Sequence, residues 1–121
     1  MKFDLQLFDS GKLEPQNSTL YNAVVKQVEK DIFMSGMEIE PTQANEPEGI
    51  LRWIHNFILE SQRGSAQKLT NFLYRADIDE HLIQVASAHW EDLELPHVLS
   101  RLVFLRELAK VRLRQGQTDT N

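Results

Sequence analysis

Histidine is the residue type in this chain that most directly suggests metal chemistry, and four histidines are present. A zinc site needs three or four nitrogen, sulfur or carboxylate ligands that converge on one point. Pairs four residues apart on a helix would supply that convergence, but His55, His81, His89 and His97 are not so spaced. We therefore predict no metal site. We expect His89, on the apolar stripe of its helix, to be a satisfied core residue.

Other catalytic constellations also fail on residue type or spacing. A di-iron bundle needs two Glu-x-x-His pairs, and only Glu94 and His97 match, at a helix start. Cysteine is absent, which excludes disulfides, thiolate ligands and cysteine nucleophiles. No phosphate-binding loop, nucleophile elbow or dinucleotide fingerprint occurs. The acids lie at helix starts and in loops, where capping and solvation account for them. The sequence thus favours a non-enzymatic protein without a cofactor.

Charge is segregated near the C-terminus. Residues 76–100 contain six acids and no lysine or arginine, whereas residues 101–114 contain five basic residues and one acid. Arg106, Lys110 and Arg114 lie four residues apart and share one helix face. Three interpretations stay open. The cations complement the helix dipole, they pair with an acidic surface of this protein or of a partner, or they contact nucleic-acid phosphates.

Apolar residues are in surplus on two predicted helices. The helix that begins at Pro47 is apolar nearly all round, with Ile50, Leu51, Trp53, Ile54, Phe57, Ile58 and Leu59. Such a helix is central or pressed against a partner, and we expect it to form the centre of the core. The last helix adds Val103, Leu108 and Val111 outside its main stripe. The surplus indicates an interface, unless the N-terminal arm covers it.

Five helices follow from periodicity and end signals. The first starts at its N-cap Ser18 and ends at residues 35–36, and the second runs from residues 46–48 to residues 62–65. The third starts at Ala66, the fourth is capped by Asp77 with Glu80 three residues on, and the fifth runs from near Pro96 to about Arg114. The fourth helix should turn Leu82, Val85, Ala86, His89 and Leu93 inward.

The first 17 residues form the exception to this helical pattern. Phe3, Leu5 and Leu7 alternate with polar residues, which predicts a half-buried strand with residues 37–40 as its partner. The alternative is an extended arm that lays its apolar side on the bundle. Residues 115–121 are polar, and we expect a disordered tail.

These elements predict an all-α fold, a compact bundle of four to five helices with an extended or short β-ribbon N-terminal arm. Residues 1–114 form a single domain, in which residues 1–17 are the arm. The chain has 121 residues, 41% hydrophobic and 26% charged, which is typical of one globular domain. No apolar run approaches the ~18 residues of a membrane span, and no secretory signal is evident, so we expect a cytoplasmic protein.

The leading functional hypothesis is a helical protein–protein interaction or self-association module. Its candidate interaction residues are Trp53, Phe57, Arg101, Arg106, Lys110 and Arg114. The alternative is a nucleic-acid-associated regulator that uses the basic face of the last helix, although a net charge of −5 argues mildly against it. A third hypothesis places a small-molecule or metal site in the core near Trp53, His89 and Trp90.

Overall fold

The computed structural model describes residues 5–8, 13 and 16–116. They form the helices α1 (Ser18–Met34), α2 (Pro47–Gly64), α3 (Ala66–Arg75), α4 (Glu80–His89) and α5 (Leu95–Arg114), preceded by a short 3-10 turn, η1 (Leu5–Leu7). No strand occurs among these described residues, and the protein is all-α, as the sequence predicts. No helix of the described part combines the length and the apolar character that a bilayer crossing demands.

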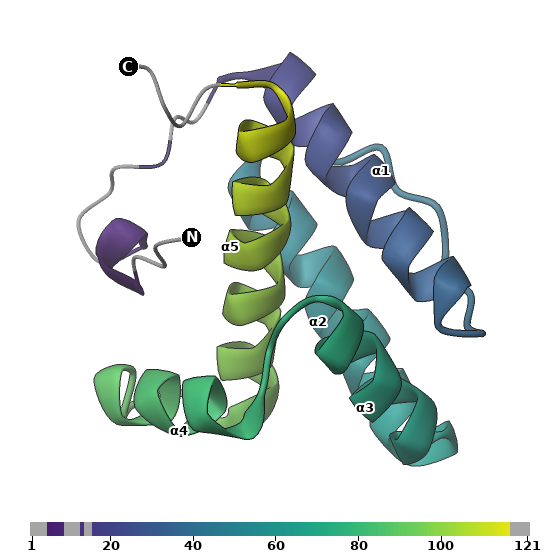
Figure 1. Cartoon of the computed structure of the whole chain (residues 1–121), viewed down its shortest axis with the longest axis vertical. Helices are drawn as coiled ribbons and strands as arrows, with labels where there is room; N and C mark the ends of the chain where they lie inside the picture. Colours follow the sequence, from purple (N-terminus) through teal and green to yellow (C-terminus); the bar gives the residue numbers. More distant parts are fainter. Residues whose placement is uncertain (1–4, 9–12, 14–15, 117–121) are drawn as a thin grey trace.

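The central helix of the bundle is α5, which contacts α1, α2 and α4 (Figure 1). It buries ten side chains, whereas α2 buries four, namely Ile50, Ile54, Phe57 and Ile58. The expectation that α2 forms the centre of the core is therefore wrong. Val103, Leu108 and Val111 of α5, the surplus residues of the sequence, are all buried within the chain.

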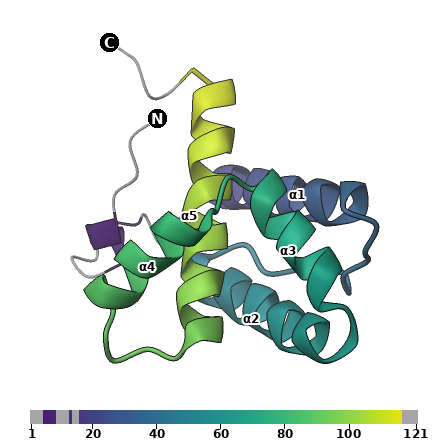
Figure 2. The same ribbon diagram turned by 60° about the horizontal axis from the view of Figure 1, so that its bottom comes forward.

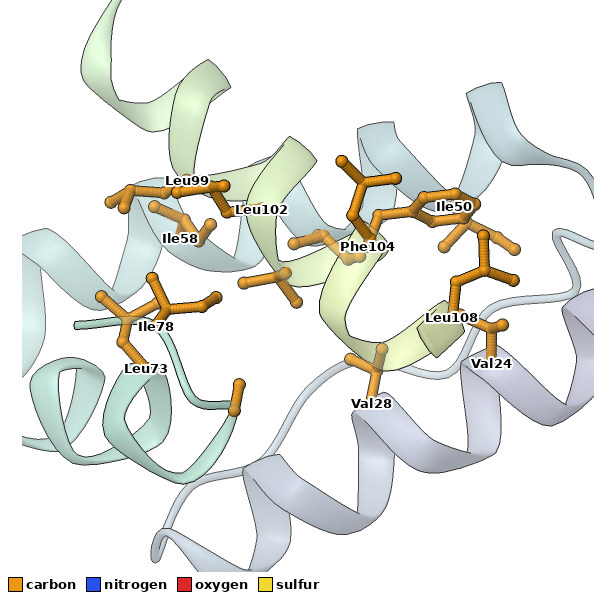
Figure 3. Close-up of a cluster of buried hydrophobic side chains, with 14 of the residues drawn as sticks. Val24, Val28, Ile50, Ile58, Leu73, Ile78, Leu99, Leu102, Phe104 and Leu108 are labelled. Carbon is orange, nitrogen blue, oxygen red and sulfur yellow. The ribbon is translucent and has the colours of Figure 1, made fainter. Parts of the chain in front are cut away.

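The core lies where α1 and α2 pack against α5 and α3 packs against α1 and α2, while α4 crosses α5 from another side (Figures 1 and 2). Figure 3 shows side chains from four helices and from the α3–α4 link meeting there. They include Val24, Val28, Ile50, Ile58, Leu73, Ile78, Leu99, Leu102, Phe104 and Leu108. Burying each such side chain contributes about 1.5–3 kcal/mol relative to leaving it in water.

Two helix caps differ from the expected residues by one or two positions. Asn17, not Ser18, caps α1, because its side chain accepts a hydrogen bond from the Leu20 N–H at 3.1 Å. Asp79, not Asp77, caps α4 by accepting from the Leu82 N–H at 2.8 Å. Both segments offer two adjacent or near-adjacent capping residues, and propensity does not choose between them.

Asp77 has a different role, because it closes α3. Its φ of +64° is the left-handed conformation that ends a helix. Its N–H donates to the Tyr74 carbonyl, and the Ile78 N–H donates to the Leu73 carbonyl at 2.9 Å. The turn also carries Ile78 into the core, where it is 2% exposed.

The inward stripe of α4 is also different from the expected one. Ala86 is buried and Leu82 is half-buried, but Val85 is 45% exposed and His89 is exposed, so His89 is not a core residue. The chain leaves α4 at His89, and the buried side chain that follows is Trp90. Its indole packs edge-on against Phe8, with a centroid distance of 6.2 Å.

The N-terminal arm is described only in part. Residues 5–7 form η1 instead of a strand, and residues 37–40 form no strand either. Phe8 lies 5.6 Å from the Phe104 ring, between centroids, so this part of the arm does cover α5. The predictions for Phe3 and for the polar tail beyond Gly116 lie outside the described residues.

The cap assignment predicts unequal effects of two substitutions in the α3–α4 link. Asp79→Ala removes the hydrogen bond to the Leu82 N–H and should lower the free energy of unfolding by about 1 kcal/mol. Asp77→Asn should change it by less than about 0.5 kcal/mol, because asparagine also tolerates the left-handed conformation. Urea denaturation of both variants measures the difference, and a loss below about 0.5 kcal/mol for Asp79→Ala would contradict the assignment of the cap to Asp79.

Candidate interaction site

The side chains of α2 divide into three stripes, which explains why this helix looks apolar nearly all round. One stripe, around Ile54, faces the core. A second, around Trp53, faces the connection between α1 and α2. A third, around His55, faces the first turns of α5. Each stripe has its own environment, so α2 carries two exposed faces as well as a core face.

The second stripe lines a groove of about 510 Å³, here called the acidic groove. Its walls are Glu38, Ile39, Glu40 and Pro41 from the connection and Trp53, Asn56, Phe57 and Glu60 from α2. Three of these residues are acidic, and none of them is basic. The groove therefore combines aromatic and aliphatic side chains with three carboxylates.

A hydrogen bond holds the two walls of the acidic groove together. The indole Nε1–H of Trp53 donates to the Glu40 carbonyl oxygen at 2.6 Å. Trp53 is half-buried, whereas Phe57 is 7% exposed and forms the floor. Because the carbonyl is a backbone group, the carboxylate of Glu40 takes no part in this hydrogen bond. The groove thus contains Trp53 and Phe57, the two α2 residues that the sequence suggested for interaction.

Four of the five basic residues of α5 have partners within the chain. The Arg101 guanidinium lies over the rings of Phe8 and Trp90, 5.1 Å from each centroid. Arg106 forms an ion pair with Asp77 at 3.8 Å, so it reaches the acidic segment that precedes α4. This pairing corresponds to one of the three interpretations of the basic face, an acidic surface of the protein itself.

The other two cations of the row turn toward α1. Arg114 donates a hydrogen bond to the Gln27 side-chain oxygen. Lys110 Nζ donates to Asp31 Oδ2 at 2.9 Å and lies 3.5 Å from Glu107 Oε1. The candidate residues of α5 are thus distributed along contacts with the N-terminal arm, the α3–α4 link and α1, away from the acidic groove.

Lys110, Asp31 and Glu107 form a buried charge cluster that sequence reasoning missed. Glu107 is 0% exposed and Asp31 is 6% exposed. Gln27 Nε2 donates to Asp31 Oδ1 at 3.2 Å, and Lys110 also donates to the Arg75 carbonyl at 3.1 Å. The cluster therefore ties together α1, α3 and α5. The sequence did contain a signal for this cluster, because Glu107 lies on the same helix stripe as the apolar core residues Val103, Phe104 and Val111.

Burial and the neighbouring Asp31 favour a proton on the Glu107 carboxyl group of the cluster. Burial raises the pKa of Glu107, the adjoining Asp31 raises it further, and Lys110 offsets only part, so that the pKa is about 9. Burial alone would raise the pKa of Asp31, but hydrogen bonds from Glu107, Lys110 and Gln27 outweigh it and lower this pKa. With an ionised side chain, neither Glu107 oxygen has a hydrogen-bond partner. A proton on Glu107 supplies the missing bond, to Asp31.

Lys110 stays charged in this environment. Burial lowers its pKa, but the charge of Glu107, the hydrogen bond to Asp31 and the charge of Asp31 outweigh burial and raise the pKa above its ordinary value. The cluster links α1 to α5 through the ion pair of Lys110 with Asp31.

The third stripe of α2 brings two histidines together. The rings of His55 and His97 stack with a centroid distance of 4.1 Å and an angle of 14° between planes. His89 and Trp90 lie at the end of α4, with their ring centroids 5.6 Å apart. Among the described residues, no group of three or more histidine, aspartate and glutamate side chains is arranged to hold a metal ion.

Comparison with known protein families, with curated proteins and with solved structures gives no match for this chain. The geometry of the acidic groove and of its charged side chains is therefore the basis for a proposed function.

The buried carboxyl pair predicts a specific pH dependence of stability. Because the folded-state pKa of Glu107 lies near 9 and its ordinary value is 4.5, folding takes up a proton between these pH values. Stability should fall as pH rises through this window, by up to about 1.4 kcal/mol per pH unit. Glu107→Gln mimics the protonated form, so its stability relative to the wild type should rise steadily from pH 5 to pH 9.

Urea denaturation at several pH values measures this difference. A stability difference between Glu107→Gln and the wild type that stays constant from pH 5 to pH 9 would contradict the proton on Glu107.

Two substitutions of basic residues separate the buried contact from an exposed one. Lys110→Met leaves the buried Asp31 carboxylate without its cation and should lower the free energy of unfolding by about 3 kcal/mol. Arg52→Met is the control, because Arg52 and its ion-pair partner Glu48 have side chains that are 67% and 84% exposed. It should cost about 1 kcal/mol or less. Equal losses in urea denaturation would show that the cluster adds nothing beyond a surface ion pair.

Proposed function

We propose that this protein is a non-enzymatic helical module for protein–protein interaction, and that its acidic groove receives a basic segment of a partner protein. The observation that carries the proposal is the lining of the groove. Glu38, Glu40 and Glu60 surround Trp53 and Phe57, and no basic side chain belongs to the lining.

The chemistry of the groove suits lysine or arginine side chains. Carboxylates attract the charged end of such a side chain, and the aliphatic stem packs on apolar surface. The face of a tryptophan ring adds a cation–π attraction of about 0.5–1 kcal/mol at an exposed site. Trp53 is half-buried with its Nε1–H already bonded to Glu40, which keeps the ring in place before a partner arrives.

A protein partner is favoured over a nucleic acid by the distribution of charge. The acidic groove repels phosphates, and Arg101, Arg106, Lys110 and Arg114 contact groups of this chain. Binding to a nucleic-acid backbone needs a row of cations available to phosphates. Self-association and a cytoplasmic location, both expected from the sequence, remain predictions.

Binding of a nona-arginine peptide, followed by tryptophan fluorescence and by amide NMR, tests the proposal. In the triple variant Glu38→Gln, Glu40→Gln, Glu60→Gln, three ion pairs of about 0.5 kcal/mol each are lost. The dissociation constant should therefore rise about tenfold. The peptide should bind the wild type more weakly as salt is added, and amide shifts should concentrate around Trp53.

The matched control is Glu80→Gln, Glu91→Gln, Asp92→Asn, which removes three exposed acids outside the groove and changes the net charge equally. Its dissociation constant should change by less than about twofold. Equal losses in the two triple variants would mean that only net charge attracts the peptide, and the groove proposal would be wrong. Sedimentation of the wild type alongside identifies a second copy of the chain as the occupant if dimers form and the groove variant abolishes them.

A further inference from the structure

A second cavity lies on the third stripe of α2, separate from the acidic groove. This histidine pocket, of about 340 Å³, is lined by Glu48, Leu51, Arg52 and His55 of α2, by Leu93, and by His97, Ser100 and Arg101 of α5. Residues far apart in the sequence thus meet where α2 packs against the first turns of α5. The two cavities share no lining residue.

Arginine and histidine side chains make up most of the polar lining of the histidine pocket. The lining contains two arginines and two histidines, but its one acidic residue is Glu48. The lining therefore has a net charge of about +1 with neutral histidines and gains charge when either is protonated. This composition is unusual in a chain with a net charge of −5.

The arginines are positioned for an anion. The Arg101 guanidinium is held over the rings of Phe8 and Trp90, which fixes its place at the pocket wall. Arg52 pairs with Glu48, at 3.9 Å, and the two side chains are 67% and 84% exposed. An exposed pair of this length is weak, so an incoming anion can replace Glu48 as the partner of Arg52.

The stacked rings of His55 and His97 add two N–H donors to the pocket. The protonation of His55 would also be favoured by a bound anion, as follows from its surroundings. Ser100 Oγ donates to the His97 carbonyl at 2.9 Å, so this hydroxyl serves the backbone of α5. Burial lowers the pKa of His55, the neighbouring His97 lowers it further, and Glu94 acts in the opposite direction. A bound anion would favour the imidazolium form of His55 that the pocket by itself disfavours. His97 also lies in the first turn of α5, near the positive end of its dipole.

We infer that the histidine pocket binds a phosphate group through Arg52, His55 and His97, while Arg101 keeps its place over Phe8 and Trp90 and adds positive charge at the wall. The guanidinium fork of Arg52 matches phosphate oxygens in geometry, and imidazole N–H groups complete the donors. The volume of the pocket exceeds that of the anion alone, and Leu51 and Leu93 offer apolar surface to the rest of a small molecule. The ligand class is therefore a small organic phosphate, with free phosphate as the other source of the same chemistry.

Chemical-shift titrations of the full chain with phenyl phosphate and with inorganic phosphate, at constant ionic strength and pH 6, test the inference. Saturable shifts should centre on His55 and His97, and phenyl phosphate should bind at least threefold more tightly than inorganic phosphate. Equal affinities would assign the pocket to the free ion. Arg52→Gln should weaken phenyl phosphate binding at least fivefold, and His97→Asn should do likewise.

The matched control is Arg63→Gln, which removes an exposed cation from the last turn of the same helix. It should change the affinity by less than twofold. Sulfate serves as a second probe because its charge stays constant between pH 6 and pH 8, whereas phosphate titrates in this range. Sulfate should bind at least threefold more tightly at pH 6, because a bound anion favours the imidazolium form of His55 among Glu48, Glu94, Arg52 and Arg101.

Shifts that do not saturate, or equal losses in Arg52→Gln and Arg63→Gln, would overturn the phosphate site. The triple glutamine variant of the acidic groove should bind phenyl phosphate as the wild type does. The two proposals can thus fail independently.

Discussion

The burial of α5 is the constraint on which the rest of the structure depends. Three helices contact it, and the arm covers part of it through Phe8. A helix enclosed in this way has little free surface for the charged residues of its middle turns. Glu107 is consequently buried among apolar neighbours and Lys110 is largely so, and each is stabilised by the other and by groups that reach it from other helices. Asp31 of α1 and the last carbonyl of α3 supply those groups, so the position of α5 also determines how α1 and α3 pack.

The same constraint decides which charges remain available for binding. Four cations of α5 contact groups of this chain. Lys110 contacts Asp31, Arg114 contacts Gln27 and Arg106 contacts Asp77, while Arg101 lies over the aromatic side chains near the arm. Breaking such contacts to bind an external partner would leave buried groups unpaired, at a cost of several kcal/mol for a buried charge. The candidate binding surfaces therefore lie on a less enclosed helix. α2 buries one stripe and leaves two others to line cavities.

The two cavities of α2 differ in the charge of their linings. Three carboxylates border the acidic groove, whereas the histidine pocket has one carboxylate and four nitrogen side chains. Opposite electrostatic preferences on one helix are compatible because side chains one position apart, such as Arg52 and Trp53, point in directions about 100° apart. A basic peptide segment and a phosphate group would thus occupy separate sites. Their binding would be coupled only through the rigid helix between them.

The sequence by itself determined the helices, because periodicity, proline and capping residues act within a few residues of one another. It predicted an all-α bundle and the ends of α2 and α5 to within a residue or two. It also suggested Trp53 and Phe57 as interaction residues, and both line the acidic groove. Only the tertiary structure decided that α5 and not α2 is central, that Asp79 and not Asp77 caps α4, and that His89 faces water. It alone brought Lys110 to Asp31, 79 residues away, and His97 to His55. Local patterns show which side of a helix is apolar, but which helix is enclosed depends on how all the apolar faces fit together. Charged side chains then take the partners that this packing brings within reach.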